Sequence, residues 1–263
     1  MRFAFAVAVV ALVAAGCGSG DDSGATPDPA PVLINDGTLT VCSSWDYEPF
    51  EFEEDGKVVG LDIDVVNAVA KDLGLRTVFK NKGFNQIQSG LVLNEGQCDL
   101  AVAALTITGE RARVMDFSSP YFQAKQAMVV QSGSGISSLD DLSGESIGVQ
   151  AGTTGELYVA DNAPDDADIV AFANASEVDE ALDTGQVAAG IYDRTVVTSV
   201  TERFPDFELA ETFDTGDQYG MAVKKNSNVE LLRSINRVLA QLEDSGQDVA
   251  IFNRWFGPAS SEQ

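Results

Sequence analysis

The feature that most constrains the fold is an alternation of β-type and helical segments. An apolar run at residues 39–44, "LTVCSS", precedes valines at helical spacing in residues 60–74, which stop at a glycine. The β-type run "RTVFK" at residues 76–80 follows, and residues 84–92 repeat apolar side chains at helical spacing. Residues 99–105, "DLAVAAL", form a continuous apolar run, as in a strand covered on both faces. The pattern predicts an α/β fold with a parallel sheet.

The same alternation starts again near residue 139. Its segments are a strand at 146–150, a turn and helix at 151–163, a strand at 168–173, a helix at 176–185, a strand at 188–193 and a helix at 194–204. A second small sheet is therefore predicted.

Two apolar extended segments lie where one set of elements gives way to the other. They are "QAMVV" at residues 126–130 and "QYGMAV" at residues 218–223. We expect the chain to cross twice between two lobes, the first formed by residues 36–125 plus 218–263 and the second by residues 126–217. A cleft between such lobes is a common ligand site, because strand ends and helix N-termini direct backbone donors into it.

The C-terminal part of the chain predicts two amphipathic helices. Apolar side chains repeat at helical spacing after Ser227, and Ser227 and Glu230 have the spacing of a capping box. Gly246 ends this helix. Residues 247–257 predict the second helix, whose aromatic side chains we assign to the core.

The charge of the chain excludes one class of partner. Its 263 residues hold 41 acidic and 16 basic side chains and no histidine, which gives a net charge of -25. Such a surface repels a phosphate backbone, so we expect no nucleic-acid partner. We attribute the acidity to solubility rather than to ligand choice.

The first residues are typical of a bacterial lipoprotein signal. An apolar run at residues 3–15 is shorter than the ~20 residues that a membrane-spanning helix needs, and it ends in "AAGC". We expect residues 1–17 to carry a signal peptide with Cys17 as the lipidated residue, which anchors the protein outside the cytoplasm. The alternative is ordinary secretion with Cys17 removed. Residues 18–35, rich in Gly, Ser, Asp and Pro, predict a flexible tether.

Two cysteines remain in the folded part of the chain, Cys42 and Cys98. In an oxidising exterior they could form a disulfide, or each could be a small buried residue in its strand. The sequence leaves both alternatives open.

Several motifs occur in a set order along the chain. They are "YEPFEF", "GLDIDVV", "CDLAVAALTITGERARVMDFSSPYF", "GVQAGTTGE", "IYDRT", "YGMAVKK" and "RWFG". Through them, from residue 39 to 257, the chain resembles the extracellular solute-binding proteins that deliver amino acids to ABC-type importers. The resemblance implies a type II periplasmic-binding-protein fold, in which two α/β lobes joined by two hinge strands close on the ligand. It also implies a monomer with an amino acid and an ABC permease as partners, and no cofactor or metal.

The resemblance assigns part of the ligand site to the first lobe. It implies that Arg111 receives the α-carboxylate of the ligand through two parallel hydrogen bonds, which a lysine cannot reproduce. It implies that Thr106 bonds the charged end of the ligand and that the carbonyl of Ala104 accepts from its ammonium group. Thr108, nearby, is equally suited to cap Glu110 and Arg111.

The resemblance assigns the remaining residues as follows. Asp193 takes the ammonium group and Thr154 contacts the ligand from the second lobe, while the rings of Tyr47 and Phe84 pack on the ligand side chain. Asp193 could also cap the helix that follows it. The turn around Thr154 has no lysine and lacks the spacing of a phosphate-binding loop, so we favour the amino-acid site there.

The main alternative is an enzyme, because periplasmic cyclohexadienyl dehydratases share this fold and many of these motifs. Such an enzyme needs a positioned general acid or base, and the chain has no histidine. A third alternative is a sensor ectodomain. Such a chain would also carry a membrane span and a cytoplasmic part, and this sequence predicts neither. Relatives that bind basic ligands, and some that bind amides, have an aspartate where this chain has Ser44, whereas Asp46 favours a basic ligand. The sequence favours a polar uncharged amino acid.

Overall fold

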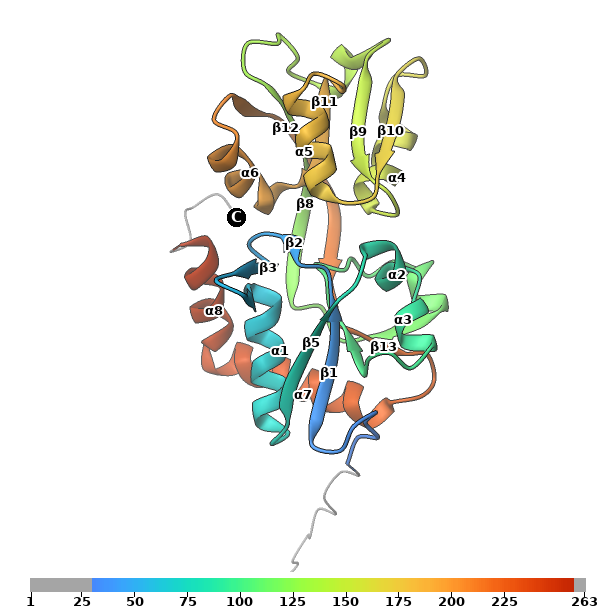
Figure 1. Ribbon diagram of the computed structural model, residues 1–263, viewed down its shortest axis with the longest axis vertical. Coiled ribbons are helices and arrows are strands. Elements are labelled where there is room, and N and C mark those ends of the chain that lie inside the picture. Colours follow the sequence, from blue (N-terminus) through green and yellow to red (C-terminus); the bar gives the residue numbers. More distant parts are fainter. Residues whose placement is uncertain (1–29, 258–263) are drawn as a thin grey trace, which may run out of the picture.

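The computed structural model describes residues 30–257 and consists of two α/β lobes, one above the other in Figure 1. The lower, first lobe is built around the sheet β5-β1-β6-β13-β7 and the upper, second lobe around β10-β9-β11-β8-β12. Cys17 and the predicted signal and tether, up to residue 29, lie outside the described residues.

The first sheet is mostly parallel. β1 pairs in parallel with β5 and β6, and β13 is antiparallel to β6 and β7. Its strands are β1 (Thr38–Ser43), β5 (Arg76–Asn81), β6 (Leu100–Ala101), β7 (Met115–Phe117) and β13 (Ala222–Lys224).

Helices cover both faces of this sheet because alternate side chains of its strands are apolar on opposite faces. Leu39 and Val41 pack in the core that includes one set of helices, whereas Cys42 faces the other set. The first set is α1 (Leu61–Asp72), α7 (Val229–Ser245) and α8 (Gln247–Phe256), and the second is α2 (Phe84–Gln88) and α3 (Leu91–Asn94).

The second lobe repeats this arrangement. β10, β9 and β11 are parallel, and β8 and β12 are antiparallel additions. Val178, Leu182 and Val200 pack on one face, and Val159 packs on the other. The elements are β8 (Phe122–Gln131), β9 (Ser146–Gln150), β10 (Asp168–Phe172), β11 (Ala189–Asp193), β12 (Phe207–Tyr219), α4 (Thr154–Asn162), α5 (Ala175–Asp183) and α6 (Val197–Arg203), with short 3-10 turns η2 (Leu139–Leu142) and η3 (Arg194–Val196). The 3-10 turn η1 (Arg111–Arg113) belongs to the first lobe.

A small three-stranded sheet sits on the first lobe beside the second lobe. It consists of β2 (Asp46–Tyr47), β3 (Glu51–Glu54) and β4 (Lys57–Val59). Gly60 joins it to α1 with a φ of 136°, and a Cβ there would lie 2.0 Å from the carbonyl oxygen of Phe50. Only glycine allows this close approach of two backbone segments.

β8 and β12 run side by side between the lobes (Figure 1). They pair antiparallel from Phe122–Tyr219 at one end to Gln131–Phe207 at the other, with two register shifts. The two crossings are as predicted, but both strands are longer than the expected segments at 126–130 and 218–223. Gly220 and Met221 separate β12 from β13, so the second segment is not one strand. The predicted lobe boundaries fall inside β8 and at the end of β12 and stay predictions.

Three local predictions are wrong. The strand expected at 99–105 pairs only over Leu100–Ala101, and Ala104 then takes a left-handed φ of 42°. The helix expected at 84–92 is two short helices, α2 and α3, separated at left-handed Gly90.

The capping box expected at the start of α7 does not form. α7 begins one residue later than the box requires, with Asn228 at its N-cap and no side-chain cap. The predicted end of α7 at Gly246 is confirmed.

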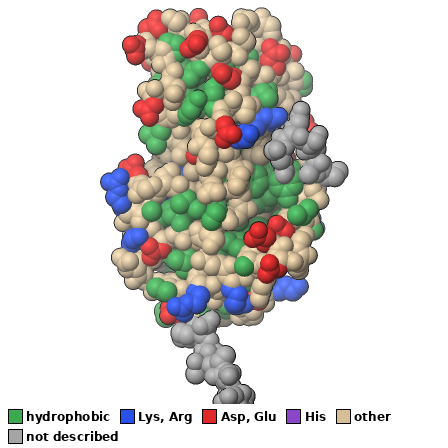
Figure 2. All heavy atoms as spheres, turned by 180° about the vertical axis from the view of Figure 1, so that it is seen from behind, with side chains coloured by type: hydrophobic (Ala, Val, Ile, Leu, Met, Phe, Trp, Pro, Cys, Tyr) green, Lys and Arg blue, Asp and Glu red, His purple; other side chains and the backbone are tan. Residues whose placement is uncertain are grey.

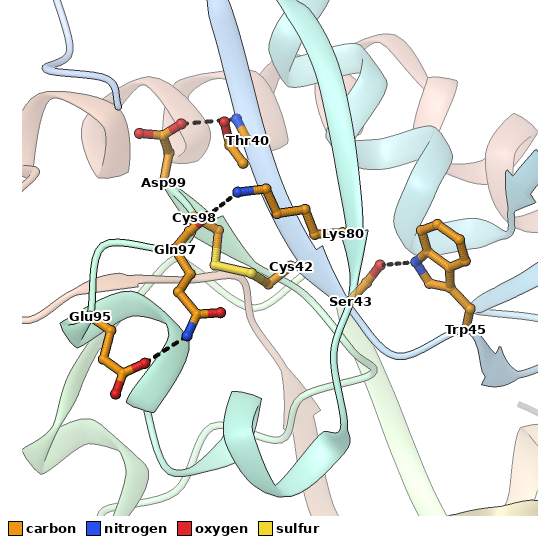
Figure 3. Close-up of a disulfide and its surroundings, with 9 residues drawn as sticks. All are labelled: Thr40, Cys42, Ser43, Trp45, Lys80, Glu95, Gln97, Cys98 and Asp99. Atoms are coloured by element: carbon orange, nitrogen blue, oxygen red, sulfur yellow. Dashed lines mark hydrogen bonds between the residues drawn. A yellow bond between two sulfur atoms is a disulfide. The ribbon is translucent and has the colours of Figure 1, made fainter. Parts of the chain in front are cut away.

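Cys42 and Cys98 form a disulfide, which decides between the two alternatives left by the sequence (Figure 3). The bond joins β1 to the segment that enters β6. Beside it, Asp99 accepts hydrogen bonds from the amides of Ile34 and Thr40, at 2.8 and 2.9 Å. These contacts link the start of the first lobe to the centre of its sheet.

Acidic side chains are spread over the second lobe on the face shown in Figure 2, whereas basic side chains gather mainly on the first lobe. Both lobes also expose apolar areas on this face. Within residues 30–257, no helix has the length and apolar character needed to cross a membrane.

Candidate functional site

A cavity lies between the two lobes. The seven residues predicted to bind the ligand all line it: Tyr47, Phe84, Ala104, Thr106, Arg111, Thr154 and Asp193. Tyr47 lies on the small sheet and Phe84 at the start of α2, whereas Thr154 starts α4 and Asp193 ends β11. The chain thus brings together side chains that are far apart in sequence.

Arg111 is the only arginine or lysine among the residues that line this cavity, and it is 5% exposed. It starts η1, where its amide donates to the hydroxyl of Thr108 at 3.1 Å, a local bond of the kind that the sequence suggested for Thr108. Its guanidinium donates to the carbonyl of Thr106 at 2.8 Å and, across the cleft, to the carbonyl of Gly152 at 2.9 Å. The ring of Phe84 lies 5.5 Å from the guanidinium carbon.

Burial lowers the pKa of Arg111 to about 10, so the side chain still carries its charge at neutral pH. Both recorded partners of the guanidinium are neutral backbone carbonyls. The charges of Asp193 and Asp217 favour the cationic form of Arg111, but within residues 30–257 neither is hydrogen-bonded to the guanidinium. An anionic group that entered the cavity could form such a charge-assisted bond.

Two hydroxyls face each other beside Arg111. Thr106 Oγ1 lies 3.5 Å from Thr154 Oγ1 on the opposite lobe. Thr154 donates to Asp217 Oδ2 on β12 at 2.9 Å, and Gln126 Nε2 lies 3.2 Å from the same oxygen. A polar network therefore runs from the first lobe to the end of a hinge strand.

The turn before α4 is held by hydrogen bonds within its own segment. Thr153 caps α4 by accepting from the amide of Glu156, and Glu156 in turn accepts from the amide of Gly152 at 2.6 Å. The Gly152 amide is therefore occupied by a carboxylate of its own chain. It is the carbonyl of Gly152, bonded to Arg111, that faces the first lobe.

Asp193 lies opposite, at the end of β11, with 9% of its surface exposed. Its Oδ2 accepts from the hydroxyl of Tyr47 at 2.7 Å, and its Oδ1 accepts from Gln126 Nε2. Burial raises the pKa of Asp193, while these donors and Tyr219 counteract the rise. Asp193 forms no side-chain cap on η3, so the alternative capping role is absent.

Ala104 is held by a buried acid behind the cavity wall. Its amide donates to Asp62 Oδ2 at 2.8 Å, and Asp62 Oδ1 accepts from the hydroxyl of Tyr121 at 2.6 Å. Burial raises the pKa of Asp62 to about 6. Glu51, which lines the cavity and is 1% exposed, is hydrogen-bonded to Asp62, and burial raises its pKa well above the ordinary 4.5. The proton of this pair therefore resides on Glu51.

The sequence analysis missed several lining residues. Gln126 and Glu51 carry the polar contacts above, and Gln150 and Tyr192 also line the cavity. Gln126 begins the predicted crossing segment, and Glu51 lies inside the quoted motif "YEPFEF". Only their positions beside predicted site residues could have indicated them, because a buried polar side chain has no local pattern of its own.

The geometry suits a small zwitterion. A cationic side chain from the first lobe and an acidic one from the second face the same cavity, each with hydroxyl or amide neighbours. An α-carboxylate fits the guanidinium, and an α-ammonium group fits the carboxylate.

Comparisons with known proteins agree with this geometry. Residues 39–258 match the model of the bacterial extracellular solute-binding proteins, family 3. A probable histidine-binding protein of Neisseria gonorrhoeae is 30% identical over 96% of this chain and 94% of its own length. The ABC transporter glutamine-binding protein GlnH of Bacillus subtilis is 29% identical over 97% of each chain.

Solved structures show the same fold. An ancestral arginine-binding protein bound to arginine matches with a TM-score of 0.79 and 38% identity, over 84% of this chain and 99% of that one. The expected type II periplasmic-binding fold is therefore confirmed, and these relatives are named as binding proteins rather than enzymes. The chain belongs to the bacterial extracellular solute-binding proteins of family 3.

Proposed function

We propose that this protein is the amino-acid-binding component of an ABC importer and delivers its ligand to a membrane permease. The observation that carries the proposal is the placement of Arg111 and Asp193 on opposite walls of one cavity between two lobes. Relatives over nearly the whole chain are named for histidine and glutamine binding, which supports a free amino acid as the ligand.

Binding and closure are coupled in this proposal. Arg111 and Thr106 hold the α-carboxylate on the first lobe, and Asp193 and Thr154 reach the ligand from the second lobe only when the cleft is shut. Contacts that exist only in the closed state shift the equilibrium toward it. The rings of Tyr47 and Phe84 contact the ligand side chain, and the carbonyl of Ala104 accepts from the ammonium group.

A thermal-shift screen of the twenty amino acids against ligand-free protein tests this function. A ligand at a hundred times its dissociation constant adds about 2.7 kcal/mol to the free energy of unfolding. The α-carboxamide of each binding amino acid is the control, because it lacks the charge that Arg111 recognises. If no amino acid raises the melting temperature, or if the carboxamides act equally, the proposal is wrong.

We also propose that Cys17 carries the lipid anchor and that the mature protein is a monomer outside the cytoplasm. The support is the signal-like sequence before Cys17 and the family's extracellular character. Two or more acyl chains give stable anchoring, since each buried methylene contributes about 0.8 kcal/mol. In its native host, the protein should partition into membranes, and Cys17→Ser should release it. Mass spectrometry of the mature N-terminus that finds no acyl group would exclude the anchor.

A further inference from the structure

The cavity contains more acidic groups than the α-groups of an amino acid require. Its lining includes Asp46, Glu51 and Asp193 but Arg111 as its only arginine or lysine. If the proposed function holds, Arg111 pairs with the ligand carboxylate and Asp193 with its ammonium group. Asp46 and Glu51 then remain for the ligand side chain.

Asp46 is held in place by its neighbour in the small sheet. The hydroxyl of Ser44 donates to Asp46 Oδ1 at 2.7 Å, and both residues line the cavity. Among residues 30–257, no hydrogen bond to the second oxygen, Oδ2, is found. Ser44 therefore does more than replace a carboxylate: it positions the carboxylate of the residue two places further along.

Glu51 offers a second acceptor. It lies opposite Tyr47 in the pairing of β2 with β3, and its Oε2 has no hydrogen-bond partner among the described residues although the side chain is buried. The other side of the carboxyl group bonds to Asp62, which is itself satisfied by Tyr121 and Ala104. An unsatisfied buried acceptor is costly, so a donor on the ligand is favoured there.

These two acceptors differ in what they select. Glu51 Oε2 needs an N–H or O–H group, which disfavours an apolar side chain. Asp46 lines the same cavity and adds a negative charge to it. A ligand side chain with N–H donors and a positive charge satisfies both, because it can donate to Glu51 and attract Asp46, whereas an acidic side chain is repelled by Asp46 and offers Glu51 no donor.

We propose that Asp46, positioned by Ser44, and Glu51 form a subsite for the cationic side chain of a basic amino acid such as arginine or lysine. This inference deepens the proposed function and rests on it. The sequence favoured a polar uncharged ligand because Ser44 stands where relatives have an aspartate. The hydrogen bond from Ser44 to Asp46 instead places a carboxylate at this part of the cavity, so we now favour a basic ligand.

Calorimetric titration of ligand-free protein with arginine, lysine, glutamine and glutamate tests the subsite. We expect the wild type to bind arginine or lysine at least about tenfold more tightly than glutamine, and glutamate least of all. Asp46→Asn should weaken binding of the basic ligand at least about tenfold and of glutamine by less than about threefold. Asp55→Asn, the same change in the exposed turn between β3 and β4, is the matched control and should alter neither affinity.

Each other outcome separates the subsite from the proposed function. Binding of glutamine or another neutral amino acid, with no measurable binding of arginine or lysine, overturns the subsite and leaves the proposed function in place. Equal losses for arginine and glutamine in Asp46→Asn also overturn it, provided that melting curves show a folded variant. Binding of no amino acid overturns both proposals.

Discussion

Arg111 is a buried guanidinium whose recorded hydrogen bonds go only to the backbone. One carbonyl acceptor belongs to Thr106 on its own lobe and the other to Gly152 across the cleft. Burying such a cation away from water is unfavourable unless a charged group pairs with it. We therefore propose that Arg111 serves ligand binding rather than stability.

Replacing Arg111 by alanine should leave the fold intact and weaken amino-acid binding by roughly 2 to 5 kcal/mol, because the ligand carboxylate then lies buried without its partner. Calorimetry measures the affinity, and a melting curve without ligand checks the fold. Arg113→Ala is the matched control, since Arg113 is exposed in the same turn and should have no effect on binding. Unchanged affinity in Arg111→Ala would remove this assignment.

Glu51 gives the stability of the ligand-free protein a pH dependence. Its folded pKa is raised well above 4.5 by burial and by Asp62, so the folded state binds this proton more tightly than the unfolded state does. The contribution of Glu51 to stability is full below about pH 4.5 and declines as pH rises toward the folded pKa, by up to about 1.4 kcal/mol per pH unit.

As the pH rises from 5 to 8, the free energy of unfolding of Glu51→Gln should therefore fall less than that of the wild type. The two slopes should differ by up to about 1.4 kcal/mol per pH unit, the effect of one proton. Denaturant unfolding of ligand-free protein at several pH values measures the difference, and Glu53→Gln, an exposed neighbour on β3, is the control. Parallel stability curves for Glu51→Gln and the wild type would contradict the assignment of the proton to Glu51.

At the scale of elements, the sequence predicted what periodicity encodes. Both sheets, the main helices and the end of α7 follow from side-chain spacing and from Gly246. The extent of β12 does not, because it lies at the edge of its sheet and leaves many side chains exposed, so its apolar signal is weak. The early end of β6 depends on the bond from Ala104 to Asp62, a tertiary contact with no local signature.

The site shows the same division. The seven positions that we propose to bind the ligand were indicated by a likeness of motifs and not by spacing, and the cavity brings them together. Gln126 and Asp217 were missed because each is a single polar residue in an extended strand, and only the folded hinge places them beside Thr154.

The disulfide ties two neighbouring strand segments of the first lobe and encloses the small sheet of β2, β3 and β4 together with α1, β5, α2 and α3. Its 56-residue separation predicts stabilisation through restriction of the unfolded chain. Cys42→Ala combined with Cys98→Ala should lower the free energy of unfolding by about 2–4 kcal/mol in denaturant titrations. A reducing agent should have the same effect on the wild type and none on the double variant. Equal unfolding midpoints for reduced and oxidised wild type would contradict this.

At the scale of the molecule, the lobes touch through the site itself. Tyr47 on the first lobe donates to Asp193 on the second, and Thr106 faces Thr154. These contacts join the lobes across the cavity, beside the hinge strand β8, and hold them together in this form.

Tyr47→Phe removes one of these contacts and should raise the radius of gyration of the ligand-free protein in small-angle X-ray scattering. Added ligand should restore the compact form, because Arg111 and Asp193 still meet it from both sides. Tyr158→Phe, the same change on α4 and away from the cavity, is the control. Identical scattering of ligand-free wild type and Tyr47→Phe would show that this hydroxyl does not hold the lobes together.

The bond between Tyr47 and Asp193 has a consequence for transport. It occupies the carboxylate that we assign to the incoming ammonium group, so an unloaded molecule can have nearly the same outline as a loaded one. A transporter that recognised only the overall shape of the binding protein would hydrolyse ATP without transporting an amino acid. Productive docking must then depend on the lifetime of the closed form. A bound amino acid prolongs that lifetime, whereas the single hydrogen bond from Tyr47 does not.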